Sequence, residues 1–184
     1  MDFIVIANAW GAGENNPTSK HQIALELCRR GHRMLWLEGA GMRRPSLGSV
    51  TDRSRIFKRV TASFRGARLA RQGEPGSGRL WVLTPLLIPL PGIRWIRKWN
   101  GWLYAILARY WARRLGFCDP VLINYAPVLA DAMSFWRTTA QRTIVYHCVD
   151  RWDAFGMYDT AMMMAADAQC CRTADVVIAS ASYK

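Results

Sequence analysis

Two stretches of the sequence place polar side chains where a buried strand would end. In residues 143–153 an apolar run leads into His147, and Asp150 follows it three positions later. An imidazole and a carboxylate at a strand end can hydrogen-bond a substrate hydroxyl, or exchange a proton with it near neutral pH. We therefore predict that His147 and Asp150 are catalytic residues. The alternative is that His147 is hydrogen-bonded within the fold and has no catalytic role.

The second stretch is a polar loop at residues 11–17, followed by a helix that we expect to be capped by Ser19. Gly11 and Gly13 would let the backbone approach a ligand closely, and the helix N-terminus would offer N–H groups to an anion. Lys20 adds positive charge in the first helical turn. These features predict a ligand-contacting loop. The loop lacks the third glycine of G-x-G-x-x-G and the G-K-[ST] ending of a P-loop, so a plain connecting loop is the alternative.

A third stretch, residues 93–115, mixes basic residues with tryptophan and is the longest helix that we expect. One face of this helix is apolar at helical spacing and is expected to face the core: Ile96, Trp99, Leu103, Ile106, Leu107 and Tyr110. The other faces carry side chains that suit anionic lipid headgroups. We predict that the following residues face a membrane: Arg94, Trp95, Arg97, Lys98 and Trp102. The alternative is a core helix with a solvated basic face.

The composition limits the class of protein. The chain has 184 residues, is 51% hydrophobic and carries a formal net charge of +12, so it can bury a core and is not expected to be disordered. It has no helix-turn-helix, zinc-finger or RNP pattern, and we expect no nucleic-acid partner. We expect no signal peptide, and the longest apolar run, residues 80–91, is too short to span a membrane. Five cysteines without a repeating spacing predict reduced thiols in the cytoplasm and no metal site.

The apolar runs, and the glycine, proline and polar residues that separate them, predict the strands and helices that position these stretches. We expect strands at residues 3–7, 33–37, 80–84, 121–125, 143–148 and 176–180. We expect helices at residues 19–30, 93–115, 128–137 and 159–173, and a basic helix at 53–71. Strands that alternate with helices predict an α/β, Rossmann-like domain with a parallel sheet of about six strands and flanking helices. Residues 1–184 would form this single domain.

An ordered set of short motifs adds a resemblance to a known family. The first motifs are Asn16-Pro17-Thr18-Ser19-Lys20-His21 and Arg30-Gly31-His32-Arg33 before a W-L-E strand. Later ones are Leu83-Thr84-Pro85, Tyr125-Ala126-Pro127, Tyr146-His147-Cys148-Val149-Asp150 and Ala174-Asp175-Val176-Val177. In this order they resemble the amino-terminal half of bacterial GT-B fold glycosyltransferases of the family-4/family-1 type, which act on cell-envelope and exopolysaccharide sugars. The resemblance covers nearly the whole chain.

The resemblance implies a reaction and a set of roles. In such enzymes two Rossmann-like domains face each other across a cleft, the first holding the acceptor and the second the nucleotide-sugar. Transfer displaces a nucleoside diphosphate at the anomeric carbon by an acceptor hydroxyl, with no cofactor because the nucleotide-sugar is a substrate. By this resemblance the substrate-binding residues are Gly11, Gly13, Ser19, Lys20 and Tyr125. His147 would reach toward the transferred sugar, with Asp150 just beyond it.

The resemblance also implies a missing part and leaves rival functions open. The donor-binding second domain has no counterpart in residues 1–184, so we expect the isolated chain to be inactive without it. The acceptor would be a glycan or lipid-linked molecule, and the enzyme would work in the cytoplasm, at the inner face of the membrane. One rival is a dinucleotide-binding Rossmann protein with Glu38 as the ribose partner. The other is a non-catalytic membrane-adaptor module that uses the basic tryptophan helix.

Overall fold

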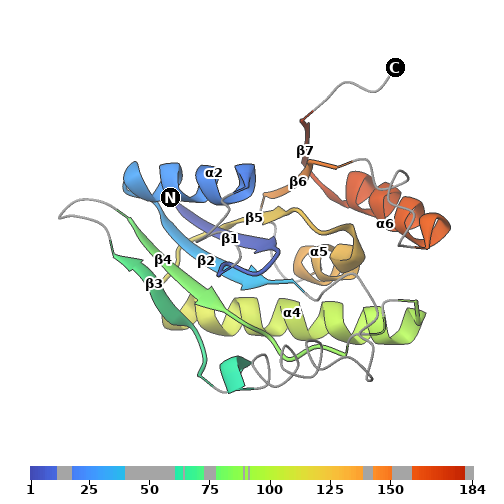
Figure 1. Cartoon of the computed structure of the whole chain (residues 1–184), viewed down its shortest axis with the longest axis horizontal. Coiled ribbons are helices and arrows are strands. Elements are labelled where there is room, and N and C mark those ends of the chain that lie inside the picture. Colours follow the sequence, from blue (N-terminus) through green and yellow to red (C-terminus); the bar gives the residue numbers. More distant parts are fainter. Residues whose placement is uncertain are drawn as a thin grey trace.

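The chain folds into an α/β domain built on one seven-stranded sheet, which confirms the predicted fold class (Figure 1). The computed structural model describes residues 1–11, 18–39, 61–63, 65–72, 78–88, 90, 92–138, 143–150 and 159–180. The strands are β1 (Asp2–Ala7), β2 (Arg33–Glu38), β3 (Arg68–Gln72), β4 (Arg79–Leu83), β5 (Val121–Asn124), β6 (Ile144–Cys148) and β7 (Val176–Ala179). The helices are α2 (Ser19–Arg29), α4 (Arg94–Arg114), the short 3-10 helix η1 (Pro127–Leu129), α5 (Ala130–Arg137) and α6 (Thr160–Thr173).

The order of the strands creates a switch point in the middle of the sheet. The spatial order is β3-β4-β2-β1-β5-β6-β7, and every pair is parallel except β3 with β4. From β1 the chain builds outward through β2 and β4 on one side, and from β5 it builds outward through β6 and β7 on the other. In doubly wound sheets, ligands bind outside the carboxyl ends of the strands at such a reversal, which here lies between β1 and β5.

Helices cover both faces of the sheet, which explains the continuous apolar runs of the central strands. Successive strand side chains point to opposite faces. Thus Ile4 and Ile6 of β1 join a core cluster with side chains of α4, α5 and α6, whereas Val5 joins a second cluster with side chains of α2. Figure 1 shows α2 on one side of the sheet and α4 and α5 on the other.

Helix α2 begins one residue earlier than the sequence predicts. The residue that caps it is Thr18, whose carbonyl accepts from the backbone N–H groups of His21 and Gln22, and Ser19 is the first helical residue. The Thr18 N–H in turn donates to Nδ1 of His21 at 3.3 Å. His21 thus provides the reciprocal contact of the cap. At the other end Gly31 has a φ of 87° and ends the helix, as predicted.

The basic helix predicted at residues 53–71 is wrong in its last part. Residues 61–63 are helical, but Arg68–Gln72 form the edge strand β3, which pairs antiparallel with β4. Residues 53–60 and 64 lie outside the described residues. The sequence does not reveal β3, because three of its five residues are polar. The strand forms because its backbone groups pair with the edge of β4.

The predicted core face of α4 is wrong in part, although the helix itself has the expected bounds: Ile96 is buried and Leu107 packs against the core, as predicted. The side chains that are buried are Ile96, Asn100, Gly101, Tyr104, Ala105, Ala108 and Ala112. Trp99, Ile106 and Tyr110, which were expected inside, are exposed. The reason is a close crossing with α5: a Cβ on Gly101 would lie 2.7 Å from Cβ of Asp131. Small residues allow this approach, so the helix packs this side against α5 and leaves Trp99, Ile106 and Tyr110 outside.

Candidate functional site

The predicted polar residues meet at the carboxyl edge of the sheet beside the switch point. Tyr125 directly follows β5, and Asn124 shapes the turn there by accepting from the Ala126 N–H at 2.9 Å. His147 lies near the end of β6 and Asp150 two residues beyond that strand. Lys20 comes from the first turn of α2, the helix that follows β1. Three separate segments therefore contribute to one place.

The distances join four of these side chains into one group, which we call the Lys20 cluster: Lys20, Tyr125, His147 and Asp150. Nζ of Lys20 lies 3.9 Å from Oδ2 of Asp150 and 5.8 Å from the centroid of the Tyr125 ring. The Tyr125 and His147 rings lie 5.0 Å apart, centroid to centroid. The Lys20–Asp150 contact is longer than a direct charge-assisted hydrogen bond, so it is a through-space ion pair.

Burial and charge set the ionisation of the cluster. Burial lowers the pKa of Lys20, and the nearby Asp150 carboxylate partly opposes that effect. Burial also lowers the pKa of His147 below its ordinary 6.5, and the Lys20 charge lowers it further. The His147 imidazole is therefore neutral at pH 7 and can accept a proton. Burial raises the pKa of Tyr125 to about 12, so its phenol keeps its proton.

The structure does not join the other residues predicted for substrate binding to the Lys20 cluster. Gly11 is exposed, and a Cβ added there would meet open space, so the backbone at this point is accessible. Ser19 is exposed in the first turn of α2. Neither makes a described contact with the Lys20 cluster. Gly13 lies outside the described residues.

The sequence did not point to Ser180 or to the aromatic group of Trp10, His21 and Trp36. Nε2 of His147 lies 3.3 Å from Oγ of Ser180, which directly follows the edge strand β7. Trp10 packs edge-on against Trp36 at 5.0 Å, and the ring of His21 stacks on Trp36 at 5.0 Å. Parallel pairing of β6 with β7 brings Ser180 to His147, and a strand-end serine is too common a pattern to reveal this from sequence.

Both carboxylate oxygens of Glu38 accept hydrogen bonds within the domain, in place of the hydroxyl groups of a ribose. Its side chain is buried at the end of β2. Oε1 accepts a hydrogen bond from the Trp10 N–H at 2.8 Å, and Oε2 accepts one from the Thr84 hydroxyl at 2.7 Å. The carboxylate therefore ties the segments after β1 and β4 together. This arrangement argues against the dinucleotide role that Glu38 would have in the rival hypothesis.

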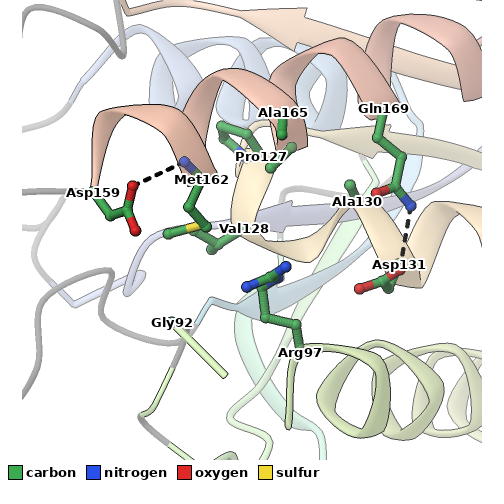
Figure 2. A pocket seen from close by; sticks show the side chains of 11 residues that line it. Gly92, Arg97, Pro127, Val128, Ala130, Asp131, Asp159, Met162, Ala165 and Gln169 are labelled. Carbon is green, nitrogen blue, oxygen red and sulfur yellow. Dashed lines mark hydrogen bonds between the residues drawn. The ribbon is translucent and has the colours of Figure 1, made fainter. Parts of the chain in front are cut away.

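A pocket of about 260 Å³ lies between α4, α5 and α6, on the side of the sheet away from α2 (Figure 2). Arg97 points into it, beside Asp131, whose Oδ1 accepts from the Gln169 side chain at 3.2 Å. Asp159 caps α6 at its rim by accepting from the Met162 N–H at 3.0 Å. Arg97, which was predicted to face a membrane, is half-buried and lines this pocket.

The other four residues predicted to face a membrane are exposed: Arg94, Trp95, Lys98 and Trp102. Within the described residues, no helix combines the length and the apolar character that a membrane-spanning segment requires. The same residues contain no group of three or more His, Cys, Asp or Glu side chains that could hold a metal ion.

Comparison with known proteins assigns no family. No protein-family model, curated protein or solved structure gave a significant match. The Lys20 cluster and its position in the sheet are therefore the observations that bear on function.

Proposed function

We propose that this chain is the acceptor-side domain of a GT-B glycosyltransferase that moves a sugar from a nucleotide-sugar to a glycan or lipid-linked acceptor of the cell envelope. One observation carries the proposal: the Lys20 cluster assembles a cation, a neutral imidazole and a carboxylate at the carboxyl edge next to the β1–β5 switch point. The ordered motifs that resemble the family point to the same residues.

In this proposal each residue of the cluster has a separate task. Lys20 and the N-terminus of α2 attract the diphosphate of the donor. The acceptor oxygen attacks the anomeric carbon, the bond from that carbon to the diphosphate oxygen breaks, and the nucleoside diphosphate leaves with the bonding electrons. The proton of the acceptor hydroxyl passes to the neutral imidazole of His147. Asp150 positions the Lys20 ammonium, and the Tyr125 ring packs against the imidazole.

The reaction also needs a group that grips the nucleotide, which the proposal assigns to a second domain or chain. A cytoplasmic enzyme at the inner face of the membrane would meet both a nucleotide-sugar and a lipid-linked acceptor. Catalysis would then consist of positioning the two substrates and stabilising the leaving diphosphate.

The first test measures ligand binding by the purified chain. Isothermal titration calorimetry is carried out with inorganic pyrophosphate, UDP-glucose and NAD⁺. We expect pyrophosphate or the nucleotide-sugar to bind, and Lys20→Met to weaken that binding at least about tenfold because it removes the central cation. Lys98→Met makes the same substitution at an exposed site on α4 and should leave binding unchanged. Binding of NAD⁺ alone would refute the proposal and favour the dinucleotide-binding rival.

The second test is transfer in extracts of cells that overproduce the chain, so that a second domain or chain can be present. Label from nucleotide-sugars should enter the lipid or glycan fraction. We expect His147→Ala to lower the rate of incorporation by about 10²-fold or more, the usual contribution of a proton acceptor. An unchanged rate with His147→Ala would remove His147 from the proposed chemistry.

A further inference from the structure

One face of α4 carries a row of large aromatic and aliphatic side chains that the fold leaves outside. We call this row the α4 stripe: Trp95, Trp99, Trp102, Ile106 and Tyr110. Their exposed fractions are 65%, 49%, 40%, 39% and 53%. The spacing of three or four residues places all five on one side of the helix. Exposed tryptophans in such a row mark an interaction surface, because tryptophan is normally well buried.

The packing of α4 prevents the stripe from turning inward. The opposite side of the helix is held against α5 by the close approach at Gly101, where an added Cβ would lie 2.8 Å from the Ala132 nitrogen. Tyr104 on that side is fully buried, and its hydroxyl donates to the backbone carbonyl of Glu38. Rotating the helix would break both contacts. The stripe is thus a fixed surface of the domain.

The segment that leads into α4 also exposes apolar side chains. Leu86, Ile88, Leu90 and Ile93 are all exposed. The Asn100 side chain holds this segment to the helix: its Oδ1 accepts from the Ile88 N–H at 3.1 Å, and its Nδ2 donates to the Ile88 carbonyl at 2.9 Å. Apolar side chains therefore gather around the amino-terminal half of α4.

The charge of α4 identifies the chemistry of the partner. Between Arg94 and Arg114 the helix has six basic residues and no acidic one. Lys98, Arg113 and Arg114 are exposed, and the two arginines lie in the last turn. Tryptophan and tyrosine favour the boundary between water and lipid, and flanking Lys and Arg side chains are attracted to anionic headgroups.

We propose that the α4 stripe docks the domain on an anionic lipid bilayer, with the helix lying in the plane of the headgroups. A second copy of the chain fits this surface less well, because two such helices would bring like charges together. This inference specifies the surface behind the peripheral location in the proposed function. Because α4 begins on the carboxyl side of β4, its amino-terminal end lies toward the same edge of the sheet as the Lys20 cluster (Figure 1). Docking would therefore bring that edge close to a lipid-linked acceptor.

The test is co-sedimentation of the purified chain with phosphatidylcholine vesicles, with and without phosphatidylglycerol. We expect binding to the anionic vesicles that weakens as salt is added. The double variant Trp99→Ala with Trp102→Ala should weaken binding at least about tenfold, because it removes the two exposed rings that lie 4.9 Å apart. Lys98→Glu with Arg113→Glu should do the same through charge alone. Arg172→Glu, an exposed charge reversal on α6, is the matched control and should bind like the parent.

Several results would overturn the inference. These are no binding of the parent chain to anionic vesicles at low salt, or equal binding by the parent and both double variants. A third is a dimer that the Trp99 and Trp102 substitutions dissociate, in a chain that does not bind vesicles. Far-UV circular dichroism of each variant checks the fold, and the charge-reversal pair leaves the apolar packing intact. Pyrophosphate binding is measured separately, so failure of vesicle binding leaves the test of the Lys20 cluster intact.

Discussion

The Lys20 ammonium of α2 lies 3.9 Å from the Asp150 carboxylate beyond β6, across the end of β5. This ion pair connects two segments that follow different strands on the two sides of the switch point. It also holds a positive charge near the neutral imidazole of His147. A site with this arrangement suits an anionic ligand with a reactive hydroxyl close by.

Removing the Lys20 charge should raise the pKa of His147. Burial is the main cause that lowers this pKa, and the Lys20 charge is the second, so Lys20→Met should move it upward. An NMR pH titration of the His147 imidazole C–H resonance in the parent and in Lys20→Met measures the change. An unmoved His147 titration in Lys20→Met would mean that the two groups are not coupled.

The Asp2–Arg33 pair should contribute stability that acid removes. Burial tends to raise the pKa of Asp2, but hydrogen bonds from Arg33 and from the Cys118 N–H outweigh it, and the pKa lies below its ordinary 3.8. The contribution is thus present above pH 3.8 and is lost as the pH falls through the lower, folded-state value. We expect Asp2→Asn to cost about 1–3 kcal/mol of the free energy of unfolding at pH 7.

Urea unfolding at a series of pH values tests this prediction. The difference between parent and Asp2→Asn should shrink below pH 3.8, because the parent carboxylate then takes up a proton as well. A difference that stays constant down to the acid limit would show that packing around residue 2, and not the charge, is responsible.

A methyl group at Gly101 should destabilise the domain although alanine favours helices. An added Cβ would lie 2.7–2.8 Å from Asp131 and Ala132 of α5, so the two helices would have to separate. We expect Gly101→Ala to cost about 1–3 kcal/mol, in place of the gain of up to about 1 kcal/mol that an exposed helix position would give. Gly11→Ala, which meets open space, is the matched control. Thermal unfolding measures both, and equal melting temperatures would contradict the close crossing.

Glu38 should matter for stability. Glu38→Ala leaves the Trp10 N–H and the Thr84 hydroxyl without their buried acceptor, and we expect a loss of about 1–3 kcal/mol. Glu26→Ala makes the same change in an exposed ion pair with Arg29 and Arg30, where we expect a much smaller loss because solvent screens the charges. Denaturant midpoints of the two variants give the comparison. Equal midpoints would show that the Glu38 hydrogen bonds contribute no more than a surface pair.

Much of the fold could be predicted from local patterns. The buried run at β1, the helix that ends at Gly31 and the apolar run of β6 are set by strand propensity, helix punctuation and glycine conformation. These properties act over a few residues, so they can be recognised without the rest of the chain. They were also sufficient to predict His147 and Asp150 at the end of a strand.

The candidate site could be predicted only in part. Lys20 and His147 were each expected at an edge of the sheet, but nothing in their spacing pairs Lys20 with Asp150 or places Ser180 beside His147. Those contacts depend on which strands are neighbours, and many strand orders are compatible with the same series of elements. β3 was missed for the same reason, because its pairing with β4 stabilises a segment that has no strand pattern of its own.

The sequence by itself determined that the chain forms an α/β domain, that it carries a net positive charge and that α4 has two chemically different faces. Only the tertiary structure decided which of those faces is outside. Apolar periodicity predicted that Trp99, Ile106 and Tyr110 of α4 would be buried, but the close crossing with α5 at Gly101 holds the opposite side of the helix against the domain. Burial is a property of two surfaces that must fit each other, and the sequence of one helix describes only one of them.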